Sequence, residues 1–148
     1  MNIALLRAIQ DRIRENPPQF EMMQWFSYSN VTETPVANWG TACCIAGWAV
    51  ALHYGVTPET ARKRADLFPK EAVRILDLTY DQGRELFYTN NWPTEFQLRY
   101  KDLCNRAINS AEGPYDIQKQ YAQLGVEVID DFIARHTPKV AVPAETTT

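Results

Sequence analysis

Apolar residues recur at every third or fourth position over most of this chain, a spacing that predicts helices with one buried face. Residues 2–15 show it first, in a stripe formed by Ile3, Leu6, Ile9 and Ile13. Asn2 is placed to cap this helix, and the Pro17-Pro18 pair ends it. The same reasoning predicts helices over residues 58–67, 69–76, 79–88, 93–109 and 115–136. No segment shows the sustained alternation of apolar and polar residues that is typical of a strand.

The segment from Ala42 to Tyr54 is apolar on every side. His53 and Tyr54 are its only polar side chains, and it contains no Asp, Glu, Lys or Arg. A helix that is apolar all round is buried all round, and about a dozen residues are too few to span a bilayer. We therefore expect a buried central helix over about 42–54, with Thr41 as its N-cap and Gly55 ending it.

These elements together predict an all-α protein. We expect a compact single-domain helical bundle of six to seven helices around the central helix, formed by residues 1–136. Thr79 and Gln82 have the spacing of a capping box, which predicts where the 79–88 helix begins. Residues 27–38 lack any periodic pattern and are predicted to form a loop. Residues 137–148 also lack a pattern, and we expect them to form a mobile C-terminal tail.

Composition and charge narrow the classes of function. The 148 residues carry a formal net charge of −3, whereas a general binder of nucleic acid or of membrane surfaces gains from a basic excess. Three cysteines, two of them adjacent, do not suit a secreted disulfide framework, so we expect a cytoplasmic protein with no membrane partner. The two histidines and three cysteines have no metal-ligand spacing, and no Gly-rich phosphate loop occurs. We therefore expect no metal and no cofactor.

One run of residues is similar to a known signature. The run WGTACCIAGWA, residues 39–49, resembles a signature of a family of small uncharacterised phage and mobile-element proteins, close to C-G-T-x-x-C-x-A-G-W/H-A. The resemblance continues from Ile3 to about Ile133 through Asn16-Pro17, Phe20, Met22, Trp25, Ala72, Leu76-Asp77-Leu78, Leu86-Phe87, Trp92-Pro93, Ala107, Ile129 and Phe132. Trp39 stands where the family commonly has its first cysteine, so a pair built from the family's two cysteines is absent. The resemblance implies a shared fold and a mobile-element origin, and no particular reaction.

Cys43 and Cys44 raise the hypothesis of a cysteine nucleophile. A thiol in the first turn of a helix feels the positive end of the helix dipole, which favours the thiolate. His136 or His53 would be the base. However, His53 lies about 15 Å further along the same helix, and no residue that would orient a base is recognisable. Cysteine in an apolar run is more often a small buried hydrophobe. A cysteine-dependent hydrolase or transferase is therefore the alternative hypothesis.

The helices predicted over residues 58–77 carry a group of basic residues. The group consists of Arg62, Lys63, Arg64, Lys70 and Arg74. Two consecutive helices with such a face can contact DNA phosphates, which gives a second alternative. A solvated face that balances nearby acids is the simpler interpretation, because the whole chain is acidic. We therefore do not expect nucleic acid to be the partner.

Aromatic residues are the least ordinary feature of the composition, with four Trp, seven Tyr and six Phe. Most belong to a core, but aromatics in a pocket can stack on a planar ligand while basic residues meet its phosphates. The candidate ligand-binding residues are Trp39, Thr41, Cys43, Trp48, Trp92, Arg62 and Arg64. Our leading hypothesis is an accessory protein of a phage or mobile element that binds a host protein or a small ligand in the host cytoplasm. Countering host defence would be one such role.

Overall fold

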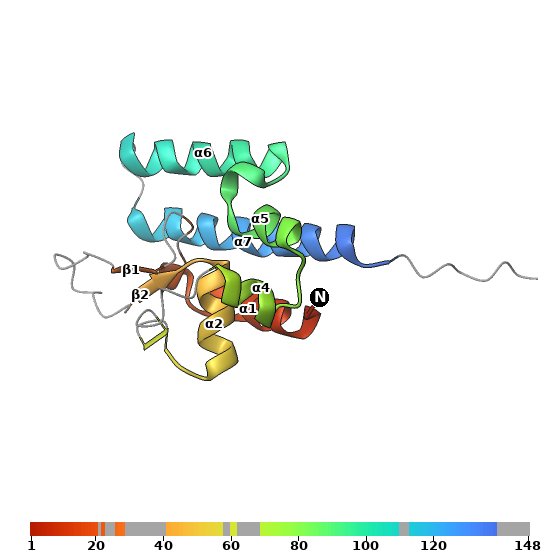
Figure 1. Cartoon of the computed structure of the whole chain (residues 1–148). Coiled ribbons are helices and arrows are strands. Elements are labelled where there is room, and N and C mark those ends of the chain that lie inside the picture. Colours follow the sequence, from red (N-terminus) through yellow and green to blue (C-terminus); the bar gives the residue numbers. More distant parts are fainter. Residues whose placement is uncertain are drawn as a thin grey trace, which may run out of the picture.

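Helix α7 (Pro114–His136) runs through the middle of the computed structural model, between α6 (Thr94–Asn109) and α1 (Ile3–Glu15) (Figure 1). Helix α2 (Ile45–Tyr54) packs against α1, and α4 (Lys70–Ile75) packs against α2. Helix α5 (Tyr80–Phe87) contacts α2, α4 and α7. The structure describes residues 1–20, 22, 26–28, 41–57, 60–61, 69–109 and 113–138. These ranges contain six α-helices with described bounds, which confirms the predicted all-α bundle.

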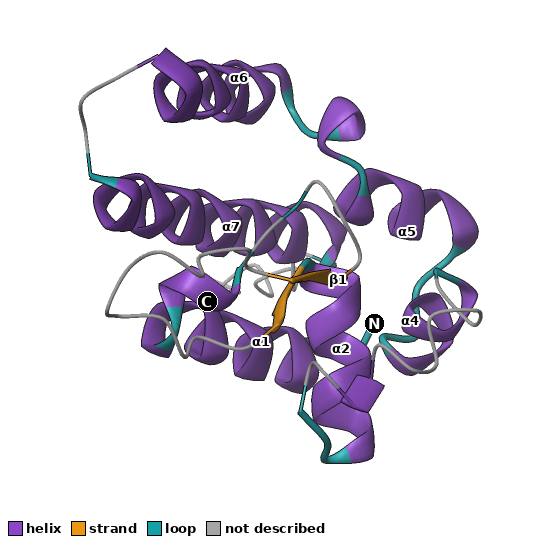
Figure 2. Ribbon diagram, turned by 90° about the vertical axis from the view of Figure 1, so that its left-hand side faces the viewer, coloured by secondary structure: helices purple, strands orange, loops and turns teal. Residues whose placement is uncertain are grey.

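Two short 3-10 helices and a two-stranded ribbon complete the described elements. The 3-10 helices are η1 (Pro17–Gln19) and η3 (Thr89–Asn91). The strands β1 (Phe26–Tyr28) and β2 (Thr41–Cys43) pair in antiparallel fashion, with Phe26 opposite Cys43 and Tyr28 opposite Thr41. Figure 2 shows this ribbon next to the start of α2, with α4 and α5 next to each other on the other side of α2.

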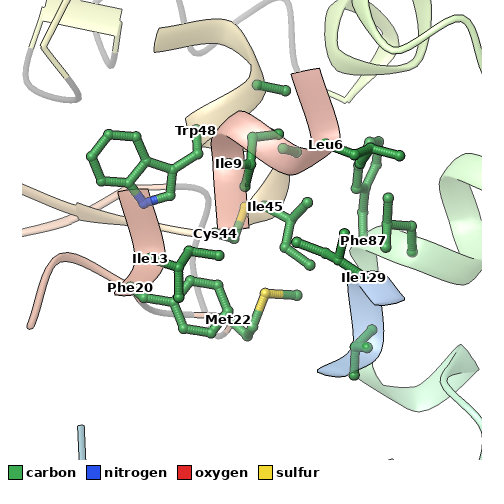
Figure 3. Packing of buried hydrophobic residues seen from close by; sticks show 14 of the residues in the cluster. Leu6, Ile9, Ile13, Phe20, Met22, Cys44, Ile45, Trp48, Phe87 and Ile129 are labelled. Atoms are coloured by element: carbon green, nitrogen blue, oxygen red, sulfur yellow. The ribbon is translucent and has the colours of Figure 1, made fainter. Parts of the chain in front are cut away.

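The core is one cluster of buried side chains that draws on all six α-helices. Helix α2 is buried from Ile45 to Ala51, as its uniformly apolar sequence predicts. Phe20 and Met22 enter the same cluster from the segment after η1, beside Ile13 and Cys44 (Figure 3).

Gly125 lets Phe20 approach α7. A Cβ atom at position 125 would lie 2.5 Å from Cζ of the Phe20 ring, so the ring occupies the space that a side chain would fill. Phe20 is only 4% exposed. The glycine therefore secures the packing of the segment after α1 onto α7.

Several predicted helix ends are confirmed by hydrogen bonds. The Asn2 Oδ1 atom accepts a bond of 3.0 Å from the Leu5 amide, as an N-cap does. Both bonds of the Thr79–Gln82 capping box are present, at 3.2 and 2.9 Å. Gly55 ends α2 with a φ of 63°, in the left-handed region.

The predicted start of the central helix is wrong. Thr41 lies in β2 and does not cap α2, whose N-cap is Cys44 in an extended conformation with no side-chain cap bond. Ser27 and Tyr28, which were predicted to begin a loop, belong to β1. The ribbon joins residues far apart in sequence, so the short strands carry no local period that a sequence window could detect.

Three predictions concern segments that are only partly described. Of the helix predicted over 58–67, the structure describes Thr60 and Ala61, and the Thr57 hydroxyl accepts a bond from the Thr60 amide. Most of the loop predicted over 27–38 and most of the tail predicted over 137–148 lie outside the described residues. Among the described residues, no helix is both long enough and apolar enough to cross a membrane.

Candidate functional site

The predicted site at the start of α2 is largely closed where the structure describes it. Cys44 is 2% exposed and belongs to the hydrophobic core. Thr41 and Cys43 lie on β2, and their side chains are outside the described part of the chain, as is the whole of Trp39. A thiol as buried as that of Cys44 is shielded from a substrate, so of the two predicted nucleophiles the one whose side chain the structure describes is not accessible.

The two other predicted tryptophans are core residues. Trp92 is 2% exposed, donates from Nε1 to the Leu86 carbonyl at 3.0 Å and meets the Tyr100 ring edge-on. Trp48 is 5% exposed, and its Nε1 has no acceptor among the described residues. Neither ring presents a face to a ligand from solvent. Arg62 and Arg64 are not among the described residues.

The two histidines lie at the ends of two different helices. His53 is in the last turn of α2, where it is exposed and packs edge-on against Tyr54. His136 is at the end of α7, where Nε2 lies 2.9 Å from Glu85 and the ring packs on Phe132. His136 thus joins α7 to α5 and faces a carboxylate instead of a thiol.

A pocket that the sequence reasoning missed lies between α4 and α5. It has a volume of about 160 Å³, and its lining is mostly apolar and aromatic with two cationic side chains. The lining residues are Pro69, Lys70, Val73, Tyr80, Gly83, Arg84, Phe87 and Tyr88. A dry apolar cavity of about 150 Å³ holds one benzene molecule, so this pocket has room for a single aromatic ring.

The turn between α4 and α5 fixes the shape of this pocket. Helix α4 ends in a Schellman motif, in which Leu78 bonds back to the Val73 carbonyl and Asp77 takes a φ of 51°. The Thr79 capping box then starts α5 immediately. Gly83 brings the two helices together, because a Cβ atom there would lie 2.5 Å from Cγ2 of Val73. The walls of the pocket are therefore set by backbone features.

Arg84 is the described arginine whose charge is not neutralised. Every other arginine in the described ranges has a carboxylate oxygen within 4 Å, whereas Arg84 has none there. Its guanidinium carbon lies 6.0 Å from the centre of the exposed Tyr80 ring. Lys70 is also exposed and has no ion pair within the described residues. The pocket thus combines an apolar interior with two available positive charges at its solvent side.

The neighbouring acid does not neutralise these charges. Glu71 accepts bonds from Nε and Nη2 of Arg74, at 3.0 and 2.5 Å, and one from the Tyr54 hydroxyl at 2.5 Å. The bonds from Arg74 first, and then that from Tyr54, lower the pKa of Glu71 to about 2. Glu71 is therefore ionised at neutral pH and binds Arg74 and Tyr54 instead of Arg84 or Lys70.

A second, larger cavity of about 390 Å³ lies between α6 and α7. Its lining residues are Leu98, Arg99, Asp102, Leu103, Arg106, Gln120 and Gln123. Both of its arginines are paired with acids, Arg99 with Glu127 and Arg106 with Asp102. Since those charges are already neutralised, this groove offers a ligand less than the α4–α5 pocket does.

The sequence did contain signals for the α4–α5 pocket. Gly83 interrupts a short amphipathic helix, where glycine costs about 1 kcal/mol relative to alanine, and such a glycine commonly marks close packing. Tyr80 and Tyr88 bracket that helix. None of the predicted ligand-binding residues is among the lining residues that the structure describes for this pocket.

Comparisons with known proteins add no relative. No protein-family model, curated protein or solved structure matches this chain. Among the described residues, no group of three or more His, Cys, Asp or Glu could hold a metal ion. The α4–α5 pocket is therefore interpreted from its own geometry and charge.

Proposed function

We propose that this chain is a small binding protein that holds one aromatic ring of a small ligand in the α4–α5 pocket. The observation that carries the proposal is a ring-sized cavity between aromatic walls, with the unneutralised Arg84 at its edge. Ligand sites are concave and mostly apolar, with a few polar groups that orient the ligand. The pocket has each of these properties.

The surroundings of the pocket favour a small ligand over a host protein. Stable protein interfaces bury about 800 Å² on each partner and have an apolar centre. On α4 and α5 the exposed side chains beside the pocket are mostly charged, including Lys70, Arg74 and Asp81. Tyr80 and Tyr88 are the exposed large hydrophobic side chains of the pocket rim. An isolated ring-sized hollow of this kind suits one small molecule.

The biological setting is a separate part of the proposal. An origin in a phage or mobile element rests only on the family resemblance, which is carried by residues 39–49 and by the matching positions from Ile3 to about Ile133. A role in countering host defence rests on the same resemblance and would make the ligand a molecule of the host cell.

Benzamide is a suitable neutral probe of this proposal. Addition of benzamide to ¹⁵N-labelled protein should shift the amide resonances of Val73, Gly83 and Arg84 in NMR spectra. Tyr80→Ala should weaken benzamide binding several-fold, because it removes one wall of the pocket. Tyr115→Ala is the matched control, since Tyr115 is also exposed and has a cation, Lys119, 4.4 Å from its ring centre.

Two outcomes would refute the proposal. One is the absence of any shift at these three amides at the highest soluble benzamide concentration. The other is equal weakening by Tyr80→Ala and Tyr115→Ala, which would indicate nonspecific contact with exposed tyrosines. Tyr80 is 73% exposed, so its removal should leave the fold intact. Unchanged circular dichroism of both variants verifies this.

A further inference from the structure

The two charges at the pocket suggest what the ligand carries besides its ring. Resting on the proposed function, we infer that the ligand is an aromatic acid whose ring enters the α4–α5 pocket and whose carboxylate or phosphate group meets Arg84 and Lys70. Lys70 is the first residue of α4 and Arg84 lies within α5, so the two charges reach the same hollow from two elements.

Arg84 is available for an anion in a way that other described arginines are not. Arg7, Arg99 and Arg135, for example, each join two helices through an acid on α7 or α5. Arg84 instead lies over Tyr80, where its planar guanidinium can still donate to an anion. A guanidinium donates two parallel hydrogen bonds to one carboxylate or phosphate group, which gives both strength and orientation.

The position of the charges sets where the acid group lies. Both side chains are exposed, so they stand at the solvent side of a cavity whose volume one ring already fills. The acid group therefore remains partly hydrated, and binding does not incur the large cost of burying an ion. Because the whole chain has a formal net charge of −3, attraction for an anion has to come from this local pair.

Benzoate and benzamide distinguish this inference from the proposed function. The two molecules have nearly the same shape, and benzoate alone is charged at neutral pH. At low salt, benzoate should bind about fivefold more tightly than benzamide, as two partly exposed ion pairs allow. Added sodium chloride should reduce that preference by screening. Phenyl phosphate, tested in the same titration, shows whether phosphate is preferred to carboxylate.

Variants that remove one positive charge show which side chain causes the preference for benzoate over benzamide. Arg84→Gln should abolish most of the preference for benzoate, measured as the ratio of the benzamide and benzoate dissociation constants, and Lys70→Gln should reduce that ratio partly. Lys101→Gln is the control, because Lys101 is exposed on α6 and its loss changes the net charge by the same amount. This control should keep the full preference.

The possible failures are separable. Equal binding of benzoate and benzamide to the pocket would overturn the inference and leave the proposed function standing. Equal weakening of both ligands by Arg84→Gln would also overturn it, because Arg84 would then act only as part of the wall. Absence of binding by either ligand would overturn the proposed function and the inference together.

Discussion

The contact between Gly125 and Phe20 predicts that a substitution favourable to helices will destabilise this protein. Alanine is preferred to glycine inside a helix by about 1 kcal/mol, so Gly125→Ala would stabilise an isolated α7. In the folded chain, however, the new Cβ atom would lie 2.5, 2.6 and 3.3 Å from three atoms of the Phe20 ring. The ring is buried and cannot swing into solvent.

The magnitude follows from these two opposing effects. Forcing extra atoms into a packed core costs about 1–3 kcal/mol, which exceeds the gain in helix propensity. We expect Gly125→Ala to lower the free energy of unfolding by about 1 kcal/mol, measured by urea denaturation followed by circular dichroism.

The same substitution in a Phe20→Leu background tests whether the contact with Phe20 causes the loss of stability. In Phe20→Leu protein the smaller side chain leaves room at position 125, so Gly125→Ala should there be neutral or stabilising. A double-mutant cycle measures this change of sign directly. A gain of about 1 kcal/mol from Gly125→Ala in the wild-type background would refute the packing described for Phe20.

Three further predictions concern the pocket's surroundings and the cysteine. The pKa of Glu71 is depressed from 4.5 to about 2, so its contribution to stability is present above about pH 4.5 and is lost as the pH falls through about 2. The difference in unfolding free energy between wild type and Glu71→Gln should therefore shrink over that range, and a constant difference would contradict the Glu71 assignment. In urea denaturation, the free energy of unfolding of Asp77→Gly should stay within about 1 kcal/mol of the wild-type value. Glycine relieves the strain of the left-handed backbone, which offsets the loss of the ion pair between Asp77 and the Met1 amino group. Asp77→Val should be clearly less stable than wild type, because a β-branched residue is strained in that conformation. Cys44 should react with iodoacetamide only as the protein unfolds, as followed by peptide mass spectrometry, and fast labelling near neutral pH would revive the cysteine-enzyme hypothesis.

Local chemistry made most of the fold predictable. The Asn2 cap and the Thr79 capping box depend on residues within one turn of each other, so a short window of sequence contains the whole interaction. The apolar run of α2 likewise contains its own reason for burial. The start of α2 was predicted wrongly because its cause lies elsewhere in the chain, in the pairing of β2 with β1.

The candidate site was harder to predict for the same reason. Trp48 and Trp92 were predicted to bind a ligand, but both contribute their volume to the core. The availability of Arg84 is a property of the folded chain, since it depends on which acids the other arginines find. No local sequence pattern shows which arginine will be left without an acid. By contrast, Gly83 is visible in the sequence and indicates the close approach of α4 and α5.

The central claim is that the α4–α5 pocket receives the ring of the ligand. A crystal structure of the protein with 4-bromobenzoate tests it most directly, because anomalous scattering from bromine locates the ring without reference to any model. We predict a bromine peak between Val73 and Tyr80, with the carboxylate beside Arg84. A peak in the groove near Leu98 and Gln120, or no peak in the α4–α5 pocket at saturating ligand, would contradict the account.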